Sequence, residues 1–193
     1  MSVRRLSTSS ALNGFPKSPN IWDQTTAAAT FDCIGTATLA SAISTITFAG
    51  IPSTYTHLQL RMTLRSSNSS TDFAVIRFNN DTTAANYYRH VTFTTGGTQN
   101  GVSSSTTTYL ATIPNSTQQA SSFSPFMVDI PNYASSSKNK TLRTMTGFDV
   151  NGSGEVSLTS ILYMSTTPIT TITISSLNAN LVQHSHVSLY GIK

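Results

Sequence analysis

Apolar and polar side chains alternate without a break over residues 56–65, and this period of two constrains the fold more than any other feature. Leu58, Leu60, Met62 and Leu64 occupy the even positions, and polar residues occupy the odd ones. Successive side chains of a β-strand point to opposite faces of the sheet, whereas a helix would scatter this apolar set around its circumference. The segment therefore predicts a strand with one buried face.

Similar segments recur after residue 30, separated by the Gly, Asn, Asp, Ser and Pro residues that are typical of turns. No segment has the pattern of an amphipathic helix, and the polar stretches 95–108 and 114–122 are expected to be loops. This succession of short strands predicts an all-β fold, a two-layer antiparallel β-sandwich of jelly-roll type. The expected strands are 36–48, 56–65, 72–78, 86–94, 106–113, 122–130, 141–149, 155–164, 169–175 and 185–192.

Residues 1–30 lack this alternation and are interrupted by Gly14, Pro16 and Pro19. We therefore expect an extended N-terminal arm, 1–30, followed by one β-sandwich domain, 31–193. The arm carries a net charge of +2 from Arg4, Arg5 and Lys17 against Asp23, and its large apolar groups are too widely spaced to form a core of their own. The arm residues expected to contact a partner are Arg4, Arg5, Phe15, Ile21 and Trp22.

Composition restricts the surface and the function. The chain has 30 Ser and 32 Thr but only 11 Lys and Arg and 7 Asp and Glu, so hydroxyls are expected to cover the exposed sheet faces. The basic residues of the body are scattered, which argues against nucleic-acid binding. The single cysteine, Cys33, excludes an intrachain disulfide and is expected to be a small buried hydrophobe.

Two further sequence features concern where the protein is made. No apolar run reaches the length of about eighteen residues that a membrane helix requires, so no membrane contact is expected. The N-terminus has two arginines but no following apolar core, so it does not resemble a secretory signal. We therefore expect the protein to be made and to mature in the cytoplasm.

Catalytic motifs are not found. The carboxylates Asp129, Asp149 and Glu155 each lie near a strand end or a turn, where a solvated or capping role is typical. Ser153 lies between two glycines but does not form the Gly-x-Ser-x-Gly elbow of hydrolases. The expectation is a protein that is not an enzyme and has no cofactor.

Two groups of residues could hold a metal ion. His184 and His186 would project to one face of a strand, where His57 or His90 could join them around zinc, although exposed or interface histidines are the simpler interpretation. Oxygen atoms from Asp72, Asn79, Asn80 and Asp81 could bind calcium, but the run 79–81 is also typical of a tight turn, and we favour the turn. No metal site is therefore predicted.

Three stretches together resemble small virion structural proteins of tailed bacteriophages, a group that includes capsid decoration (cement) proteins and modules of tail fibres. The stretches are Arg4–Ser9 with Lys17–Gln24, Ile46–Arg61 with Arg77–Thr82 and Asn86–Tyr87, and the ending Ser188–Lys193. The resemblance implies a protein of the virion capsid surface that binds the major capsid protein lattice and stabilises the head, and it implies no catalytic residues. A homotrimer would match a threefold capsid site.

A tail-fibre or tail-tip module that binds a receptor or carbohydrate is the alternative that this resemblance leaves open. Aromatic side chains in loops are suited to sugar rings, although scattered tyrosines more often seal the ends of a sandwich. The tyrosines in or beside expected loops are Tyr55, Tyr87, Tyr88, Tyr109 and Tyr133.

Overall fold

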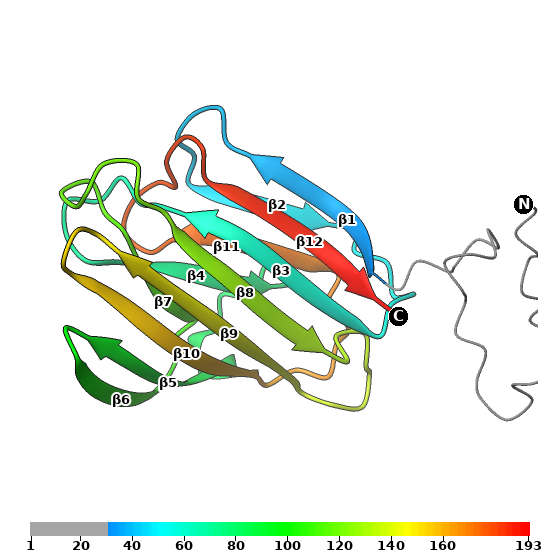
Figure 1. Ribbon diagram of the computed structural model, residues 1–193. Helices are drawn as coiled ribbons and strands as arrows, with labels where there is room; N and C mark the ends of the chain where they lie inside the picture. Colours follow the sequence, from blue (N-terminus) through cyan, green and yellow to red (C-terminus); the bar gives the residue numbers. More distant parts are fainter. Residues whose placement is uncertain (1–30) are drawn as a thin grey trace, which may run out of the picture.

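The computed structural model describes residues 31–193, which form two antiparallel β-sheets packed face to face (Figure 1). The large sheet contains, in spatial order, β1 (Phe31–Thr38), β12 (His186–Ile192), β3 (His57–Leu64), β8 (Ser124–Pro131), β9 (Lys140–Asp149), β10 (Gly154–Tyr163), β5 (Tyr87–Thr95) and β6 (Thr98–Ser105). The small sheet contains β2 (Thr45–Ala49), β11 (Thr171–Ser176), β4 (Asp72–Phe78) and β7 (Tyr109–Ile113). One 3₁₀ turn, η1 (Ala84–Asn86), precedes β5.

The connections confirm the predicted jelly-roll sandwich. The chain passes from one sheet to the other at eight of the eleven connections between strands, so that β1, β12, β3 and β8 lie opposite β2, β11, β4 and β7. This order is that of two Greek keys wound into a double sheet. We call these eight strands the framework.

Two β-hairpins are added to the framework and widen the large sheet. The hairpin β5–β6 is inserted between β4 and β7, the hairpin β9–β10 is inserted between β8 and β11, and β10 pairs with β5. The large sheet therefore has eight strands where the small sheet has four. We call β5, β6, β9 and β10 the inserted hairpins.

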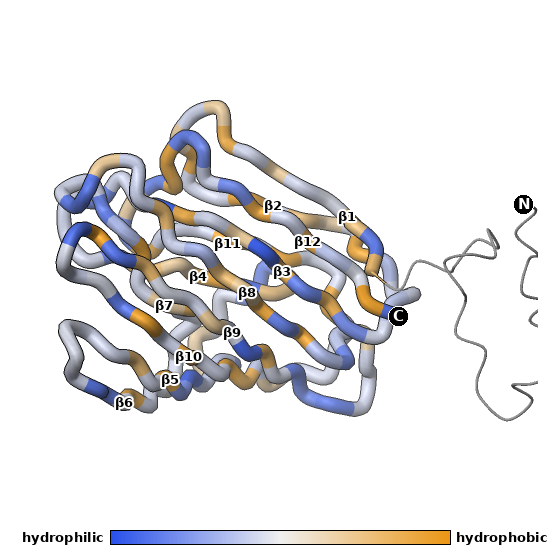
Figure 2. Tube along the Cα trace, in the orientation of Figure 1, coloured by the Kyte–Doolittle hydropathy of each residue, from blue (hydrophilic) through white to orange (hydrophobic). Residues whose placement is uncertain are grey.

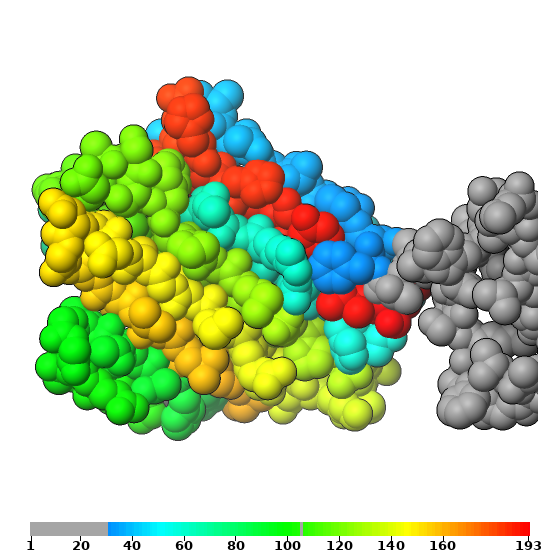
Figure 3. Space-filling model, viewed as in Figure 1, coloured from blue at the N-terminus to red at the C-terminus, as the bar shows by residue number. Residues whose placement is uncertain are grey.

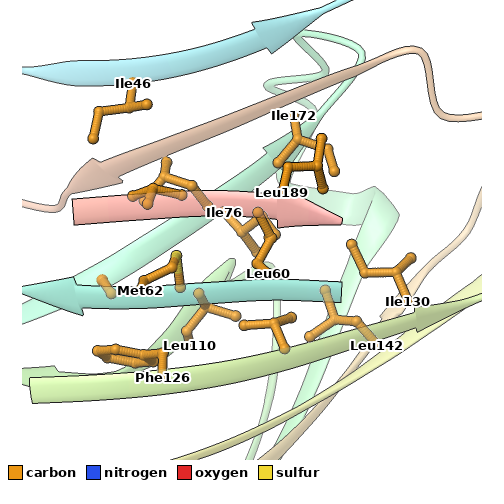
Figure 4. Close-up of a cluster of buried hydrophobic side chains, with 14 of the residues drawn as sticks. Ile46, Leu60, Met62, Ile76, Leu110, Phe126, Ile130, Leu142, Ile172 and Leu189 are labelled. Carbon is orange, nitrogen blue, oxygen red and sulfur yellow. The ribbon is translucent and has the colours of Figure 1, made fainter. Parts of the chain in front are cut away.

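The expected core forms where the alternation predicts it. Leu58, Leu60, Met62 and Leu64 of β3 are all buried in the core. Figure 4 shows Leu60 and Met62 among apolar side chains of the small sheet such as Ile76 and Ile172. Hydrophobic and hydrophilic positions alternate along the strands of the large sheet because its other face is open to solvent (Figure 2). Burying each of these side chains stabilises the fold by about 1.5–3 kcal/mol.

Two strand predictions are wrong. The expected strand 36–48 is divided into β1 and β2, because residues 39–44 carry the chain from one sheet to the other while the Leu39 amide donates to the Ser185 carbonyl at 2.9 Å. The expected loop 95–108 contains β6, which has no apolar alternation. A turn at Gly96–Gly97, with φ of 56° and 84°, aligns β6 with β5, and backbone hydrogen bonds then complete the hairpin.

Two long cationic side chains are buried at the ends of the sandwich, where backbone carbonyls satisfy them. The Arg65 guanidinium donates to four carbonyls of the loop after β7, and the Lys140 ammonium donates to three carbonyls. Burial lowers the pKa of Lys140. The acceptors of Arg65 are Asn115 (2.6 Å), Gln119 (2.8 Å), Ser122 (2.9 Å) and Gln118 (3.1 Å), and those of Lys140 are Ser135 (2.6 Å), Lys138 (3.1 Å) and Ser165 (3.2 Å).

Candidate functional site

The usual relation between polarity and burial is reversed in the middle of the β9–β10 hairpin. Toward the small sheet this hairpin buries four hydroxyl residues, Thr144, Thr146, Ser157 and Thr159. Toward solvent it presents Met145, Val156 and Leu158, which are 56%, 64% and 52% exposed. Side chains of successive strand residues point to opposite faces of the sheet. The outward position of these apolar residues therefore follows from their places in the strands. Departures of this kind from the normal pattern are expected at functional surfaces.

The strand register places these apolar residues in one row across the outer face of the large sheet. Met127 of β8 lies opposite Met145 of β9, and Met145 lies opposite Leu158 of β10. Val156 stands two positions from Leu158 on the same strand. A contiguous apolar row across three neighbouring strands is typical of an interaction surface. We call Met127, Met145, Val156 and Leu158 the methionine row.

A polar row runs beside the methionine row on the same face. Gln59 of β3 lies opposite Asp129 of β8, Asp129 lies opposite Arg143 of β9, and Arg143 lies opposite Ser160 of β10. Ser160 in turn lies opposite His90 of β5. The two rows together give the outer face both the apolar area and the hydrogen-bonding groups that binding surfaces combine.

The charges of the polar row are only partly satisfied within the protomer. Gln59 Nε2 donates to Asp129 Oδ1 at 2.8 Å, but Asp129 and Arg143 form no ion pair with each other. Within residues 31–193, no hydrogen bond or ion pair involves the Arg143 side chain, and the one ion pair is Lys193–Asp32 at 3.5 Å. The Arg143 guanidinium is therefore available to a binding partner.

An aromatic cluster ends the outer face near the sheet edge. The rings of Phe31 and Tyr190 are stacked with centroids 4.7 Å apart, and the Arg61 guanidinium lies 5.5 Å from the Phe31 centroid. Arg61 Nε also donates to Gln59 Oε1 at 3.0 Å. These contacts hold Arg61 on the surface beside the methionine row, and they add a rigid contact area to the same face.

Two shallow depressions lie on this outer face. The first, of about 540 Å³, is lined by residues of the inserted hairpins, including His90, Arg143, Leu158 and Ser160. The second, of about 650 Å³, contains Met127 and Met145 and extends to Tyr190. Figure 3 shows the outer face of the large sheet, with the surface hollowed between β10 and the β5–β6 hairpin. The inserted hairpins therefore line the first depression, and framework strands line most of the second.

The arm residues proposed from the sequence cannot be placed. Arg4, Arg5, Phe15, Ile21 and Trp22 lie outside the described residues. Their role as partner contacts stays a prediction, as do the capsid partner and the homotrimer.

The described residues do not bring the candidate metal ligands together. His184 lies in a loop with φ of 70° while His186 begins β12, and both ring nitrogens of His186 bond to hydroxyls, with Nδ1 2.7 Å from Thr38 and Nε2 2.7 Å from Ser188. Asp72 and Asp81 lie at opposite ends of β4. Residues 31–193 contain no group of three or more His, Cys, Asp or Glu suited to a metal ion.

The turn interpretation of residues 79–81 is confirmed. Asn79 and Asn80 have φ of 51° and 56°, and the Asp81 amide donates to the Phe78 carbonyl at 2.8 Å. Asp72 is fully buried instead, and it accepts hydrogen bonds from the hydroxyls of Ser66 and Ser176 and from the amide of Asn178. Its oxygens are therefore used within the fold.

The structure also shows the positions of Asp149, Glu155 and Cys33, three further residues considered in the sequence. Asp149 caps the β9–β10 turn, as expected, by accepting from the amide of Asn151 at 2.8 Å, and Glu155 accepts from the Thr112 hydroxyl at 2.8 Å. The prediction for Cys33 is wrong, because it is exposed on the outer face of the edge strand β1.

The five loop tyrosines do not form a common surface. Tyr87 and Tyr133 are buried, Tyr55 and Tyr109 are half-buried, and Tyr88 is exposed on the outer face of β5. Desolvation raises the pKa of Tyr87, whose hydroxyl accepts from the Phe78 amide at 3.2 Å. Sealing of the sandwich thus accounts for Tyr87 and Tyr133, while Tyr88 remains available for contact.

Sequence reasoning missed the methionine row, although a signal was present. On β9 the step from the buried Leu142 to the outward Met145 is three residues, and on β10 the step from the outward Leu158 to the buried Ile161 is also three. An odd step between apolar residues within one strand means that they face opposite sides. These odd steps mark where the outer face becomes apolar.

Comparisons with protein families, curated proteins and solved structures found no match. Within residues 31–193, no helix has the length and apolar character needed to cross a membrane. The outer face of the large sheet is therefore the candidate site on physical grounds alone, as a broad and partly apolar binding surface.

Proposed function

We propose that the chain is a structural protein of a bacteriophage particle that decorates the capsid, with segment 1–30 as the attachment arm and the sandwich as the displayed body. The observation that carries this proposal is the position of Phe31. Phe31 begins β1, an edge strand of the large sheet, and pairs with Ile192 near the other end of the described chain. A segment that joins the body at one corner can bind a partner without altering the sandwich.

The sandwich has the properties that repeated display requires. Within residues 31–193 a core from Leu39 to Leu189 fills the sandwich, and buried Arg65 fixes a long loop to it. Ser and Thr cover much of its surface, so close packing of many copies immobilises fewer long side chains than a Lys- and Glu-rich surface would. Binding to the assembled lattice alone would stabilise that lattice by mass action.

Deletion of residues 2–24 tests the attachment role. We expect the truncated protein to keep the wild-type circular dichroism spectrum and melting temperature but to lose co-sedimentation with purified capsids. As a finer comparison, Trp22→Ala should weaken capsid binding, whereas Leu177→Ala, at an exposed leucine of the body, should not. Undiminished capsid binding by the truncated protein would show that the arm is not the attachment segment.

A carbohydrate-binding module of the tail tip is the second candidate, favoured by the depression between the inserted hairpins. His90, Ser103, Arg143 and Ser160 surround it with groups that can bond to sugar hydroxyls. Copy number separates the two functions: hundreds of copies in each particle would indicate decoration, and a handful would indicate a tail tip. Quantitative gel electrophoresis of purified particles measures this directly.

A further inference from the structure

We propose that the outer face of the large sheet binds a second copy of this chain, around a twofold axis that runs parallel to the strands between β8 and β9. The proposal concerns the body alone and does not depend on where the particle protein attaches. It replaces the homotrimer that was expected from the sequence with a dimer. It follows from the strand register and from the arrangement of charges on this face.

The twofold axis makes the face complementary to itself. A rotation about an axis between β8 and β9 places β9 of the partner over β8 of the first copy. Because Asp129 and Arg143 are cross-strand neighbours, Asp129 would face the partner's Arg143, and Arg143 would face the partner's Asp129. Both charges of the pair, which form no ion pair within the protomer, would then be neutralised across the interface.

The methionine row is brought together by the same rotation. Met127 would face the partner's Met145, so that four methionine side chains meet next to the axis. Methionine and arginine are enriched in protein interfaces, and methionine adapts its shape to an irregular partner surface. Apolar area that is open in the protomer would be buried in the dimer.

Positions farther from the axis also match. Gln59 of β3 would face the partner's Ser160, and Arg61 would face the partner's Leu158, where its aliphatic stem can cover the leucine. No like charges oppose each other among these pairs. Two sheets that pack face to face differ in strand direction by about 30°. This angle displaces facing residues least next to the axis, so the pairs closest to the axis are aligned best.

Charge substitutions in the full chain test this arrangement by sedimentation velocity. The wild type is expected to be a dimer at micromolar concentration. Asp129→Arg and Arg143→Asp should each weaken dimerisation by about a hundredfold or more, because each places like charges on both sides of the axis. The double variant Asp129→Arg/Arg143→Asp should dimerise again, since it restores opposite charges with their positions exchanged.

Mixing the two single variants gives the decisive measurement. The guanidinium groups of the first variant would face the carboxylates of the second, so two proteins that are monomers alone should form a heterodimer together. A change in folding or in contacts within one protomer cannot produce this result. Failure of the mixture to associate would overturn the proposal.

Matched controls separate the interface from general effects of charge and polarity. Lys138→Asp makes the same change in charge as Arg143→Asp, but at an exposed residue of the loop after β8, and should leave the dimer intact. Met145→Ser should weaken the dimer by about tenfold, whereas Met164→Ser, at a similarly exposed methionine outside the face, should not.

Three other results would contradict the proposal. They are a wild-type chain that remains monomeric, a trimer, and a dimer that the charge substitutions do not affect. If the wild type is monomeric and Arg143→Asp instead abolishes retention on an alginate matrix, the face is a polysaccharide site and not a dimer interface.

Discussion

Within the large sheet, the framework strands and the middle of the β9–β10 hairpin place apolar side chains on opposite faces. On the framework strand β3, Leu58, Leu60, Met62 and Leu64 point toward the small sheet. On the inserted strand β10, Ser157 and Thr159 point inward while Val156 and Leu158 point outward. The large sheet thus has a conventional part that forms the core and, in the middle of β9–β10, a reversed part that is suited to binding.

The edge of the small sheet explains why the reversal is tolerated. The framework strands of the large sheet face the four strands of the small sheet, but the inserted hairpins reach beyond β7, the edge strand of the small sheet. There the Thr159 hydroxyl donates to the Leu110 carbonyl of β7 at 2.7 Å, and the Thr112 hydroxyl donates to Glu155 Oε2 at 2.8 Å. The exposed edge of β7 thus offers a partner to Thr159, whereas the buried hydroxyls of Thr144 and Ser157 have none within residues 31–193.

The comparison indicates that the middle of the β9–β10 hairpin is stabilised by interactions different from those that stabilise the framework strands of the large sheet. The inserted hairpins do bury Tyr87, Leu142, Ile161 and Tyr163 in the core. In the middle of β9–β10, however, hydroxyl residues face inward, and the outward apolar side chains contribute little to the protomer. We therefore expect substitutions at framework positions to alter stability and substitutions at outward positions of the hairpins to alter binding.

The largest predicted effect comes from truncating the same side chain in the two regions. Leu60→Ala should lower the free energy of unfolding by about 3 kcal/mol, because it leaves a cavity in the core. Leu158→Ala should change it by less than about 0.5 kcal/mol, since its side chain contacts mainly solvent. Urea unfolding at a concentration low enough for the monomer measures both, and similar losses would remove the distinction between the regions.

A second comparison concerns arginines. Arg65→Met should lower the free energy of unfolding by about 2 kcal/mol, because four carbonyls, that of Asn115 buried, lose their donor and the loop after β7 loses its anchor. Arg143→Met, on the outer face, should leave the stability of the monomer unchanged. Protease sensitivity confined to residues 114–123 in the Arg65 variant would identify the released loop, and an equal effect of the two substitutions would contradict the assignment.

The framework was predictable from the sequence wherever burial specifies the residues. The strand over residues 57–64 and the turn at residues 79–81 follow from alternation and from turn chemistry, and both are present. The strand β6 was not predictable, because its sequence TQNGVSSS has no apolar periodicity and it forms by pairing with β5. A strand held by backbone bonds alone leaves no hydrophobic pattern in the sequence.

The candidate site was less predictable than the fold. Which residues share the methionine row depends on the order β8, β9, β10 and on the register between these strands, and neither can be derived from a single strand. The sequence does contain the odd steps between apolar residues of β9 and β10. Without the neighbouring strands, those steps are equally consistent with a bulge.

A further prediction concerns the hydroxyl groups that are buried in the middle of the β9–β10 hairpin. Thr144 is buried in β9, and its hydroxyl has no hydrogen-bond partner within residues 31–193. Thr144→Val should therefore raise the free energy of unfolding by about 1 kcal/mol, because it removes an unsatisfied polar group while keeping the side-chain shape. Thr159→Val should lower it by about 1 kcal/mol, since the Leu110 carbonyl loses its donor. Thermal unfolding of the two variants should thus shift in opposite directions, and a shift in the same direction would refute the difference between the two sites.

The smallest predicted effect lies at the junction between the two regions, where Asp81 follows the framework strand β4. Burial raises the pKa of Asp81, but hydrogen bonds from the Asn86 side chain at 2.6 Å, the Thr83 amide at 2.8 Å and the Tyr163 hydroxyl at 3.2 Å outweigh it, so the pKa is lowered. Its ionised form is thus stabilised by folding. This stabilisation is complete above the unfolded pKa of about 3.9 and is lost as the pH falls through the lower folded value.

Asp81→Asn should reduce stability near neutral pH by a small amount, because Asp81 is partly exposed and solvent screens its interactions. The difference between wild type and variant should shrink as the pH falls from about 7 to about 3, where the wild-type carboxylate takes up its proton. Urea unfolding at a series of pH values measures this difference. Asn86→Ala should remove part of the same pH dependence, since the Asn86 amide donates to the carboxylate. Asn86 precedes β5 and Tyr163 ends β10, so the Asp81 carboxylate links the framework to the inserted hairpins through these two residues. A difference in stability between wild type and Asp81→Asn that stays constant at every pH would contradict this link.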